Sequence, residues 1–285
     1  MKNIGVVGCG LMGAGIAEVA ARADLDVLVV ESSPEAAAAG RERLAASLRR
    51  AEAKGKIADA AAVLDRVRVI TELDALADRE IVIEAIVEDE GAKVRLFSAL
   101  DAIVTSPDAI FASNTSSIPV TRLAVATSRP SHVVGLHFFN PVPVLSLVEL
   151  APTLLTDPDV AERARTFARD TLGKHVIESK DRSGFVVNAL LVPFLLSAIR
   201  MVESGFATAE DIDEGMVRGC AHPQGPLALV DLIGLDTTKA VAESLYEEFK
   251  EPLYAPPPLL SRMVEAGLLG RKSGRGFYRY ERNRA

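Results

Sequence analysis

The sequence predicts an α/β fold in its first two thirds and an all-α fold in the remainder. Short, mostly β-branched apolar runs alternate with helical patterns up to about residue 183, which is typical of βαβ units and a mostly parallel sheet. After that point long helical stretches follow with almost no strand signal. We therefore expect one domain over residues 1–183 and a second over residues 184–285.

The apolar runs define the predicted strands, and the helical patterns lie between and after them. The strands are Ile4–Val7, Val27–Val30, Val67–Ile70, Ile81–Glu84, Ile110–Ser113 and Val133–Leu136. In the first domain we expect helices over Met12–Ala23 and from Ser33 to about Lys54, where Pro34 occupies the first helical position. In the second domain the predicted helices are Phe185 to about Glu203, Asp231–Phe249 and Leu259–Ala266.

Composition and charge narrow the class of protein. Hydrophobic residues make up 49% of the 285 positions and charged residues 25%, as in globular proteins with a sizeable core. The net charge of −7 disfavours a nucleic-acid binder, which usually carries a basic domain. We see no targeting segment and no apolar stretch that could span a membrane, and the two cysteines suit a reducing compartment, so we expect a cytoplasmic protein. No His, Cys or Asp spacing suggests a metal site.

The first predicted strand leads into a glycine motif, Gly8-x-Gly10-x-x-Gly13, which opens a predicted helix. A strand, this motif and a helix together are typical of a Rossmann-type dinucleotide-binding domain, in which the helix N-terminus stabilises a pyrophosphate. Glu31 follows the second strand, where a carboxylate binds ribose hydroxyls and repels a 2′-phosphate. This favours NAD over NADP. The alternative is a structural glycine turn with an unrelated surface glutamate.

Two residues are candidates for acid–base chemistry. His137 ends an apolar run, at the sheet edge where open α/β sheets bind their ligands. Glu149 lies twelve residues later inside an apolar run, and a buried carboxylate is costly unless it is paired. A His137–Glu149 pair would explain both, because the carboxylate would fix the imidazole tautomer and support the imidazolium. A packed or capping histidine is the alternative, and the sequence leaves both open.

Two further polar positions interrupt apolar segments. Ser116 lies in a hydroxyl-rich segment, residues 113–117, after another predicted strand. This segment is either part of a site at the carboxyl edge of the sheet or a turn that caps the helix beyond Pro119. Asn188 interrupts the start of the apolar helix and is either a site residue or a surface amide.

Together these motifs resemble the 3-hydroxyacyl-CoA dehydrogenase family, closest to its bacterial 3-hydroxybutyryl-CoA dehydrogenases, over nearly the whole chain. The motifs are Gly8–Gly13, Asn114–Ser117, His137–Pro141, Val148-Glu149, Asp181–Asn188 and Gly274–Tyr278. The resemblance implies that His137 is the catalytic base, that Glu149 orients it, and that Ser116 and Asn188 bind the substrate oxygen. It implies cofactor contacts from Gly8, Gly10, Leu11, Met12, Gly13, Glu31, Glu88, Lys93 and Lys272, and CoA contacts from Ser47 and Lys54.

The chain departs from the family pattern at three positions. Ser183 stands where the family usually has proline, Ala189 where an arginine is common, and Asp89 where asparagine is usual. The proposed His–Glu pair is untouched, so these departures bear on substrate preference more than on the type of reaction.

The sequence also indicates where CoA would bind. Residues 41–56 contain six basic and two acidic residues, although the whole chain has a net negative charge. Such a helix could attract the phosphates of CoA, or it could be an ordinary solvated face.

The function that the resemblance implies is NAD-dependent interconversion of a 3-hydroxyacyl-CoA and a 3-ketoacyl-CoA, with the active site between two domains. We expect the helical domain to bind substrate and to form a homodimer, with apolar Phe194–Met201 available for the contact. The alternatives are a sugar-acid dehydrogenase of the gulonate type, which needs no CoA site, and a non-catalytic NAD-binding structural protein.

Overall fold

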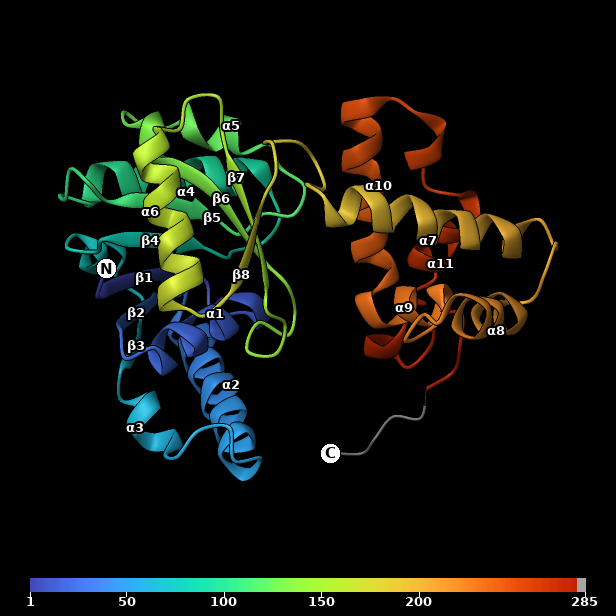
Figure 1. Cartoon of the computed structure of the whole chain (residues 1–285), viewed down its shortest axis with the longest axis horizontal. Helices are drawn as coiled ribbons and strands as arrows, with labels where there is room; N and C mark the ends of the chain where they lie inside the picture. The colour runs from blue at the N-terminus through green and yellow to red at the C-terminus, as the bar shows by residue number, and fades with distance from the viewer. Residues whose placement is uncertain (281–285) are drawn as a thin grey trace. The chain divides into compact units, whose positions relative to one another are not determined.

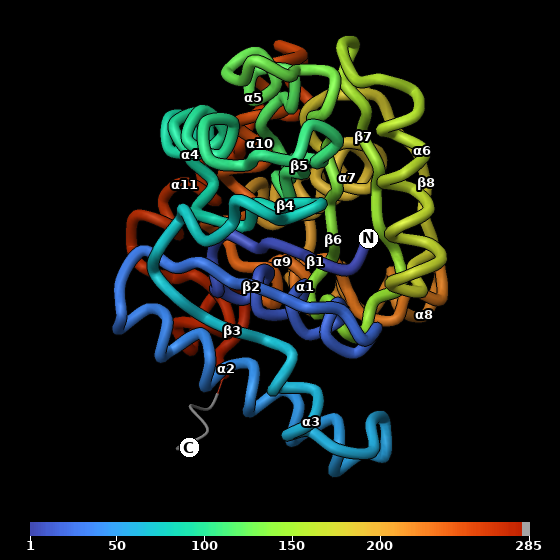
Figure 2. Tube along the Cα trace, turned by 90° about the vertical axis from the view of Figure 1, so that its left-hand side faces the viewer, coloured from blue at the N-terminus to red at the C-terminus, as the bar shows by residue number. Residues whose placement is uncertain are grey.

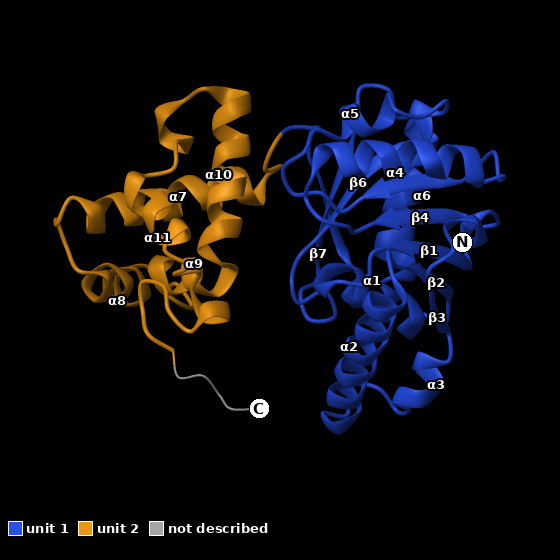
Figure 3. Cartoon of the chain, turned by 180° about the vertical axis from the view of Figure 1, so that it is seen from behind, with its two compact units in different colours: residues 1–182 blue, residues 183–285 orange. Residues whose placement is uncertain are grey.

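The computed structural model describes residues 1–280 and divides into two compact units, with the chain passing from one to the other between Arg182 and Ser183 (Figure 3). The first unit contains an eight-stranded sheet with helices, and the second is built from helices (Figure 1). The predicted fold class is confirmed. No helix in the described part of the chain is long and apolar enough to cross a membrane.

The sheet of the first unit has the order β3-β2-β1-β4-β5-β6-β7-β8, and Figure 2 shows β3, β2, β1, β4 and β5 in succession. The strands are β1 (Asn3–Val7), β2 (Asp26–Val30), β3 (Val67–Ile70), β4 (Ile81–Glu84), β5 (Ile110–Ser113), β6 (Val133–Phe138), β7 (Leu147–Pro152) and β8 (His175–Glu178). Neighbouring strands are parallel except β6 and β7, which are antiparallel. β7 and β8 were not among the predicted strands.

The helices of the first unit connect these strands. They are α1 (Leu11–Arg22), α2 (Pro34–Ala53), α3 (Ala60–Leu64), α4 (Glu90–Ile103), α5 (Val120–Ala124) and α6 (Pro158–Thr166). Side chains cap several of them: Ser33 accepts a hydrogen bond from the amide of Ala36, and Asp89 from that of Ala92. Asp89 stands where the family pattern has asparagine. Aspartate and asparagine are both good N-caps, so this difference leaves the start of α4 intact.

The pleat of the sheet separates an apolar face from a face that carries polar groups. Successive side chains in a strand point to opposite faces. Ile83, Ala112, Leu136 and Val148 belong to one core cluster, together with residues of α1, α2 and α6. Their chain neighbours Glu84, Ser113, His137 and Glu149 therefore share the other face, and all four are buried.

The second unit is a bundle of five helices over the described residues. They are α7 (Val187–Glu203), α8 (Ala209–Cys220), α9 (Pro226–Ile233), α10 (Leu235–Phe249) and α11 (Pro258–Glu265). The single predicted helix over Asp231–Phe249 is wrong, because Gly234, with a φ of +104°, ends α9 and begins α10. That left-handed conformation favours glycine. α8 was not predicted.

Two buried aspartates hold the bundle together. Asp213 accepts hydrogen bonds from the amides of Leu227 and Ala228 at the start of α9 and from the hydroxyl of Tyr278. Asp231 accepts them from the amides of Phe277 and Tyr278 and from the hydroxyl of Tyr280. Burial and the neighbouring Asp231 raise the pKa of Tyr280 to about 12, so this hydroxyl remains a donor at neutral pH. Phe277 and Tyr278 of the Gly274–Tyr278 motif thus pack against the core of this unit.

Each unit anchors its own side of the boundary. On the first unit, Asp181 accepts hydrogen bonds from the amides of Val120 and Thr121 at the start of α5. On the second unit, the amide of Ser183 donates to Oε2 of Glu248 at 2.8 Å, and its hydroxyl lies 2.9 Å from that of Ser244. A proline at position 183 has no N–H and no hydroxyl, so the serine makes two interactions that the usual family residue cannot make.

We expect Ser183→Pro to lower the free energy of unfolding by about 1–3 kcal/mol, because both hydrogen bonds are lost at a buried position. Ser183→Ala is the matched control: it keeps the N–H bond to Glu248 and should cost less. Chemical denaturation of the full-length protein measures both. Equal or greater stability of the proline variant would contradict this account.

Candidate active site

The glycine motif forms a turn from β1 into α1 in which little space is left beside two of its glycines. Gly8 has a φ of +94°, and a Cβ at Gly13 would lie 1.9 Å from the carbonyl oxygen of Gly8. By contrast, a Cβ at Gly10 would meet no described atom within 4 Å. Gly8 and Gly13 thus allow the strand and helix to pack closely, and Gly10 leaves the backbone open to a ligand.

The N-terminus of α1 is suited to a phosphate. None of the described side chains caps it, and no acidic residue occupies its first turn, which Leu11, Met12 and Gly13 begin. Uncapped amides and the helix dipole favour a negative group at this position. The residues present therefore fit the pyrophosphate of a dinucleotide.

A cavity of about 500 Å³ adjoins this turn. It is lined by Gly8, Gly10, Glu31, Thr71, Ile86 and others at the carboxyl ends of β1, β2, β3 and β4. Glu31 accepts hydrogen bonds from the amides of Cys9 and Ser32, which orient its carboxylate at the cavity wall. A ribose fits beside a carboxylate in this position, and a 2′-phosphate would be repelled by it.

Cys9 lies inside the glycine turn and is almost completely buried. A Cβ at Gly40 of α2 would lie 2.7 Å from the sulfur of Cys9, so only a glycine there lets the helix pack on the turn. Burial, with a smaller effect of Glu31, raises the pKa of the Cys9 thiol to about 12. Arg43 of α2 completes this contact by donating to the carbonyl oxygen of Cys9 at 2.6 Å.

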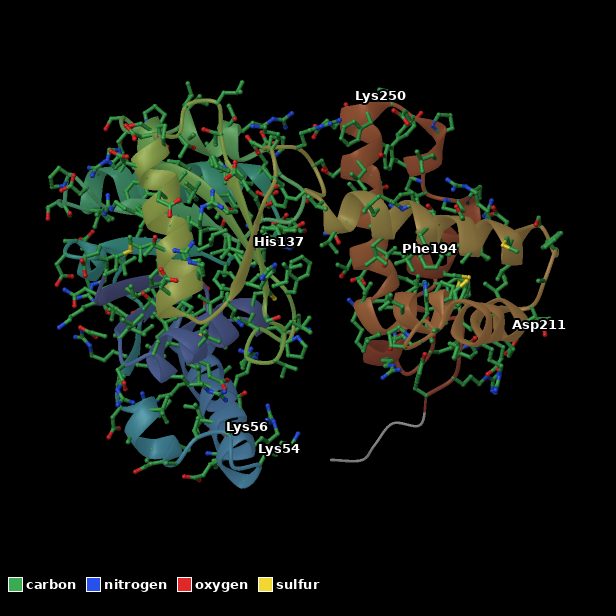
Figure 4. The ribbon with its side chains drawn as sticks, viewed as in Figure 1. Lys54, Lys56, His137, Phe194, Asp211 and Lys250 are labelled. Atoms are coloured by element: carbon green, nitrogen blue, oxygen red, sulfur yellow. The ribbon has the colours of Figure 1, made fainter. Side chains whose placement is uncertain are left out.

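His137 and Glu149 form a buried pair (Figure 4 labels His137). They lie directly opposite each other in the antiparallel β6–β7 ladder, and Nδ1 of His137 is 2.8 Å from Oε2 of Glu149. An ionised carboxylate can only accept, so the hydrogen of this bond belongs to Nδ1. The contact between these two side chains that the sequence left open is thus present.

The turn between β6 and β7 is held by a buried lysine. Nζ of Lys174 donates to the carbonyl oxygens of Val142 and Leu145, at 2.5 and 2.8 Å. Burial, and to a lesser extent Arg22, lowers the pKa of Lys174. The turn also contains a cis peptide bond between Asn140 and Pro141. These contacts fix the connection that brings Glu149 back beside His137.

Ser116 lies in the loop after β5, and the carboxylate of Glu88 is the centre of that loop. Oε1 of Glu88 accepts hydrogen bonds from Thr115, Ser116 and Ser117. Although burial acts to raise it, the charge of Lys93 and the hydrogen bond from Thr115 hold the pKa of Glu88 below its ordinary value. Glu88 and Lys93 form an ion pair of 3.0 Å. The structure thus brings Ser116, Glu88 and Lys93 together.

The CoA candidates Ser47 and Lys54 lie on one face of α2. With Arg43 and Arg50 they are spaced by three or four residues, which places all four along a single stripe. Arg50 and Lys54 form no ion pair with any described residue, and Figure 4 shows Lys54 at the far end of α2. Three arginines of the predicted basic patch are less available to a phosphate. Arg41 and Arg43 donate to backbone carbonyl oxygens, and Arg49 pairs with Glu42.

Asn188 and Lys272 belong to the second unit. Asn188 lies in the first turn of α7, after a sharp bend at Gly184 and Phe185, which have φ angles of +75° and +45°. Lys272 forms an ion pair of 2.6 Å with Asp236 of α10. Over residues 1–280 no group of three or more His, Cys, Asp or Glu side chains could hold a metal ion.

Sequence reasoning missed three residues of the site. The sequence predicts Glu84 only as the end of a strand and Arg43 only as part of a basic patch. Asn114 was seen only as one member of a motif, yet its Oδ1 accepts a hydrogen bond from the amide of Phe138, next to His137. For Glu84 the sequence does offer a signal: it is a glutamate at the end of an apolar strand, and a buried carboxylate requires a partner.

Each of the two units matches a family of known proteins. The model of the 3-hydroxyacyl-CoA dehydrogenase NAD binding domain matches residues 3–182, and that of the C-terminal domain of the same family matches residues 184–280. A 3-hydroxybutyryl-CoA dehydrogenase of Mycobacterium tuberculosis is 58% identical over 282 residues, covering 98% of this chain and 99% of the relative.

More distant relatives match over similar lengths. The human mitochondrial hydroxyacyl-coenzyme A dehydrogenase is 42% identical, covering 99% of this chain and 92% of the human protein. The solved structure of the (S)-3-hydroxybutyryl-CoA dehydrogenase from Ralstonia eutropha superposes with a TM-score of 0.93 at 46% identity, and 99% of this chain and 100% of that one are covered.

Proposed function

This chain belongs to the 3-hydroxyacyl-CoA dehydrogenase family, and from that premise we propose that it interconverts short-chain 3-hydroxyacyl-CoA and 3-ketoacyl-CoA, 3-hydroxybutyryl-CoA above all, through a His137–Glu149 dyad. It is an NAD-dependent oxidoreductase. The observation that carries the dyad is the buried 2.8 Å contact between Nδ1 of His137 and Glu149 at the carboxyl end of β6.

The roles of the two residues follow from their charges. In the direction of oxidation, Nε2 of His137 takes the proton of the substrate hydroxyl, and in reduction the imidazolium returns it. Glu149 has no exposed surface, so its negative charge acts on the imidazolium with little screening by water. Bound NAD would supply the hydride chemistry, and the uncapped start of α1 and Glu31 would hold its pyrophosphate and its adenosine ribose, respectively. Ser116, and Asn188 from the second unit, are proposed ligands of the substrate oxygen.

We expect His137→Gln to lower kcat for acetoacetyl-CoA reduction by roughly 10²–10⁴, the usual contribution of a positioned proton donor. Glu149→Gln keeps the shape of the side chain and removes its charge, so kcat should fall while the melting temperature changes little. The two losses should not add in the double variant, because the residues act as one unit. Steady-state kinetics and NADH titration measure these effects.

His175→Gln is the matched control, since this exposed histidine on β8 lies outside the proposed site. Near-normal turnover by a folded His137→Gln variant would rule out His137 as the acid–base residue. Fully additive losses in the double variant would show that the two residues do not cooperate.

Glu31 is the proposed basis of cofactor choice. We expect a clear preference for NADH over NADPH in kcat/KM, because the Glu31 carboxylate would face the 2′-phosphate. Glu31→Gln should lower the ratio of kcat/KM for NADH to kcat/KM for NADPH. Glu162→Gln, which removes a carboxylate on α6, should leave this ratio unchanged. A preference of the wild-type protein for NADPH would contradict the assignment.

The stripe of Ser47, Arg50 and Lys54 is the proposed binding surface for CoA phosphates. We expect Lys54→Ala to raise KM for acetoacetyl-CoA several-fold more than KM for NADH. The difference in KM for acetoacetyl-CoA between variant and wild type should shrink as salt rises, because exposed charges are screened beyond about 10 Å at roughly 0.1 M. Lys2→Ala, which removes an exposed cation elsewhere in the unit, is the control. Equal effects of Lys54→Ala on both substrates would count against this surface.

We also propose a cytoplasmic homodimer formed through the helical unit. The free cysteines Cys9 and Cys220 suit a reducing compartment. Most of the apolar stretch Phe194–Met201 packs inside the unit, because Leu195, Leu196, Ala198 and Ile199 belong to its own core, whereas Met201 remains partly exposed. Exposed apolar side chains support the dimer instead, notably Phe206 at 77% exposure beside Met201.

A further inference from the structure

We propose that Glu84 is a positioning residue for the reaction: through Lys93 and Ser113 it holds the 115–117 loop, and with it the hydroxyl of Ser116. This inference rests on the proposed function, in which Ser116 binds the substrate oxygen. The family resemblance assigns Glu88 and Lys93 to the cofactor and assigns no role to Glu84.

Glu84 is the last residue of β4 and has no exposed surface. Its Oε1 accepts from Nζ of Lys93 at 2.6 Å and from the amide of Ile86 at 2.8 Å, and its Oε2 accepts from the hydroxyl of Ser113 at 2.6 Å. Lys93 is also almost completely buried. A buried ion pair adds little stability compared with an apolar pair of the same size, so its stability contribution alone does not account for it.

Lys93 connects Glu84 to the loop that carries Ser116. Its Nζ lies between two carboxylates, 2.6 Å from Glu84 and 3.0 Å from Glu88. Oε1 of Glu88 in turn accepts from the hydroxyl of Thr115 at 2.6 Å and from the amide of Ser116 at 3.0 Å. The loop therefore folds around one oxygen atom whose position depends on Lys93.

Ser113 provides a second connection from Glu84 to the same loop. Its hydroxyl donates to Glu84 and accepts from the amide of Thr115 at 3.2 Å. The amide of Asn114 donates to the backbone carbonyl oxygen of Glu84, and Asn114 then accepts from the amide of Phe138. The side chain of Glu84 thus reaches the loop through Ser113 as well as through Lys93.

The hydroxyl of Ser116 itself remains loosely held. It lies 3.4 Å from Oε1 of Glu88, a long and weak hydrogen bond, whereas the backbone of the same residue is held at 3.0 Å. Backbone restraint combined with a weakly bonded hydroxyl suits a group that must donate to a substrate oxygen. The network places this hydroxyl without consuming its hydrogen bond.

The test is a double-mutant cycle between Glu84→Gln and Ser116→Ala, measured as kcat for acetoacetyl-CoA reduction, with NADH affinity by fluorescence titration and the melting temperature. Glutamine still accepts from Ser113 but does not attract Lys93. We expect Glu84→Gln to lower kcat about tenfold, with a smaller effect on NADH affinity. In the Ser116→Ala background its further effect on kcat should be less than about twofold, because both changes act on one hydroxyl.

Ser113→Ala removes the second connection from Glu84 to the loop and should also lower kcat, and it carries the test if Glu84→Gln fails to fold. Glu18→Gln is the control: Glu18 is a buried glutamate on α1 paired with Arg22, so its loss should lower the melting temperature but not kcat. Independent effects of Glu84→Gln and Ser116→Ala on kcat would overturn the proposal, as would a weaker affinity for NADH with kcat unchanged. A wild-type protein that does not reduce acetoacetyl-CoA would instead refute the proposed function.

Discussion

A carboxylate inside a protein is stable only where cations or hydrogen-bond donors surround it, and both units of this molecule are organised by that requirement. In the first unit Glu84 and Glu149 gather donors from two strands and one helix at the carboxyl edge of the sheet. In the second unit Asp213 and Asp231 gather the start of α9 and the C-terminal aromatic segment. Each carboxylate joins segments that are far apart in sequence, so the requirement for partners determines both the packing and the geometry of the site.

The reversal of direction between β6 and β7 gives the proposed dyad its form. In an antiparallel ladder, residues directly opposite each other share a face of the sheet and lie close together. His137 and Glu149 use that relation, so the backbone ladder sets their distance and neither side chain needs to extend far. Because the turn between them is itself held by Lys174, the pair is pre-organised before any ligand binds.

Much of the first unit could be predicted because its central strands are fully buried and read as continuous apolar runs. β7 was harder, since Glu149 interrupts its apolar pattern, and β8 is short and only partly buried at the sheet edge. The contact of His137 with Glu149 required the strand direction, which periodicity does not contain. The roles of Glu84 and Asn114 required the order of the strands, because their partners come from neighbouring strands and loops rather than from nearby positions in the chain.

The packing of Cys9 beneath Gly40 has a consequence for the reactivity of the protein toward electrophiles. The thiolate is the nucleophilic form of cysteine, and a thiol with a pKa near 12 is almost entirely protonated at neutral pH. The Cys9 thiol in the nucleotide-binding turn is therefore a poor nucleophile. Oxidants and covalent inhibitors that target thiols will instead meet Cys220, which is exposed at the end of α8 in the other unit. Selective thiol chemistry on the folded protein can thus attach a probe to the helical unit and leave the dinucleotide site unmodified.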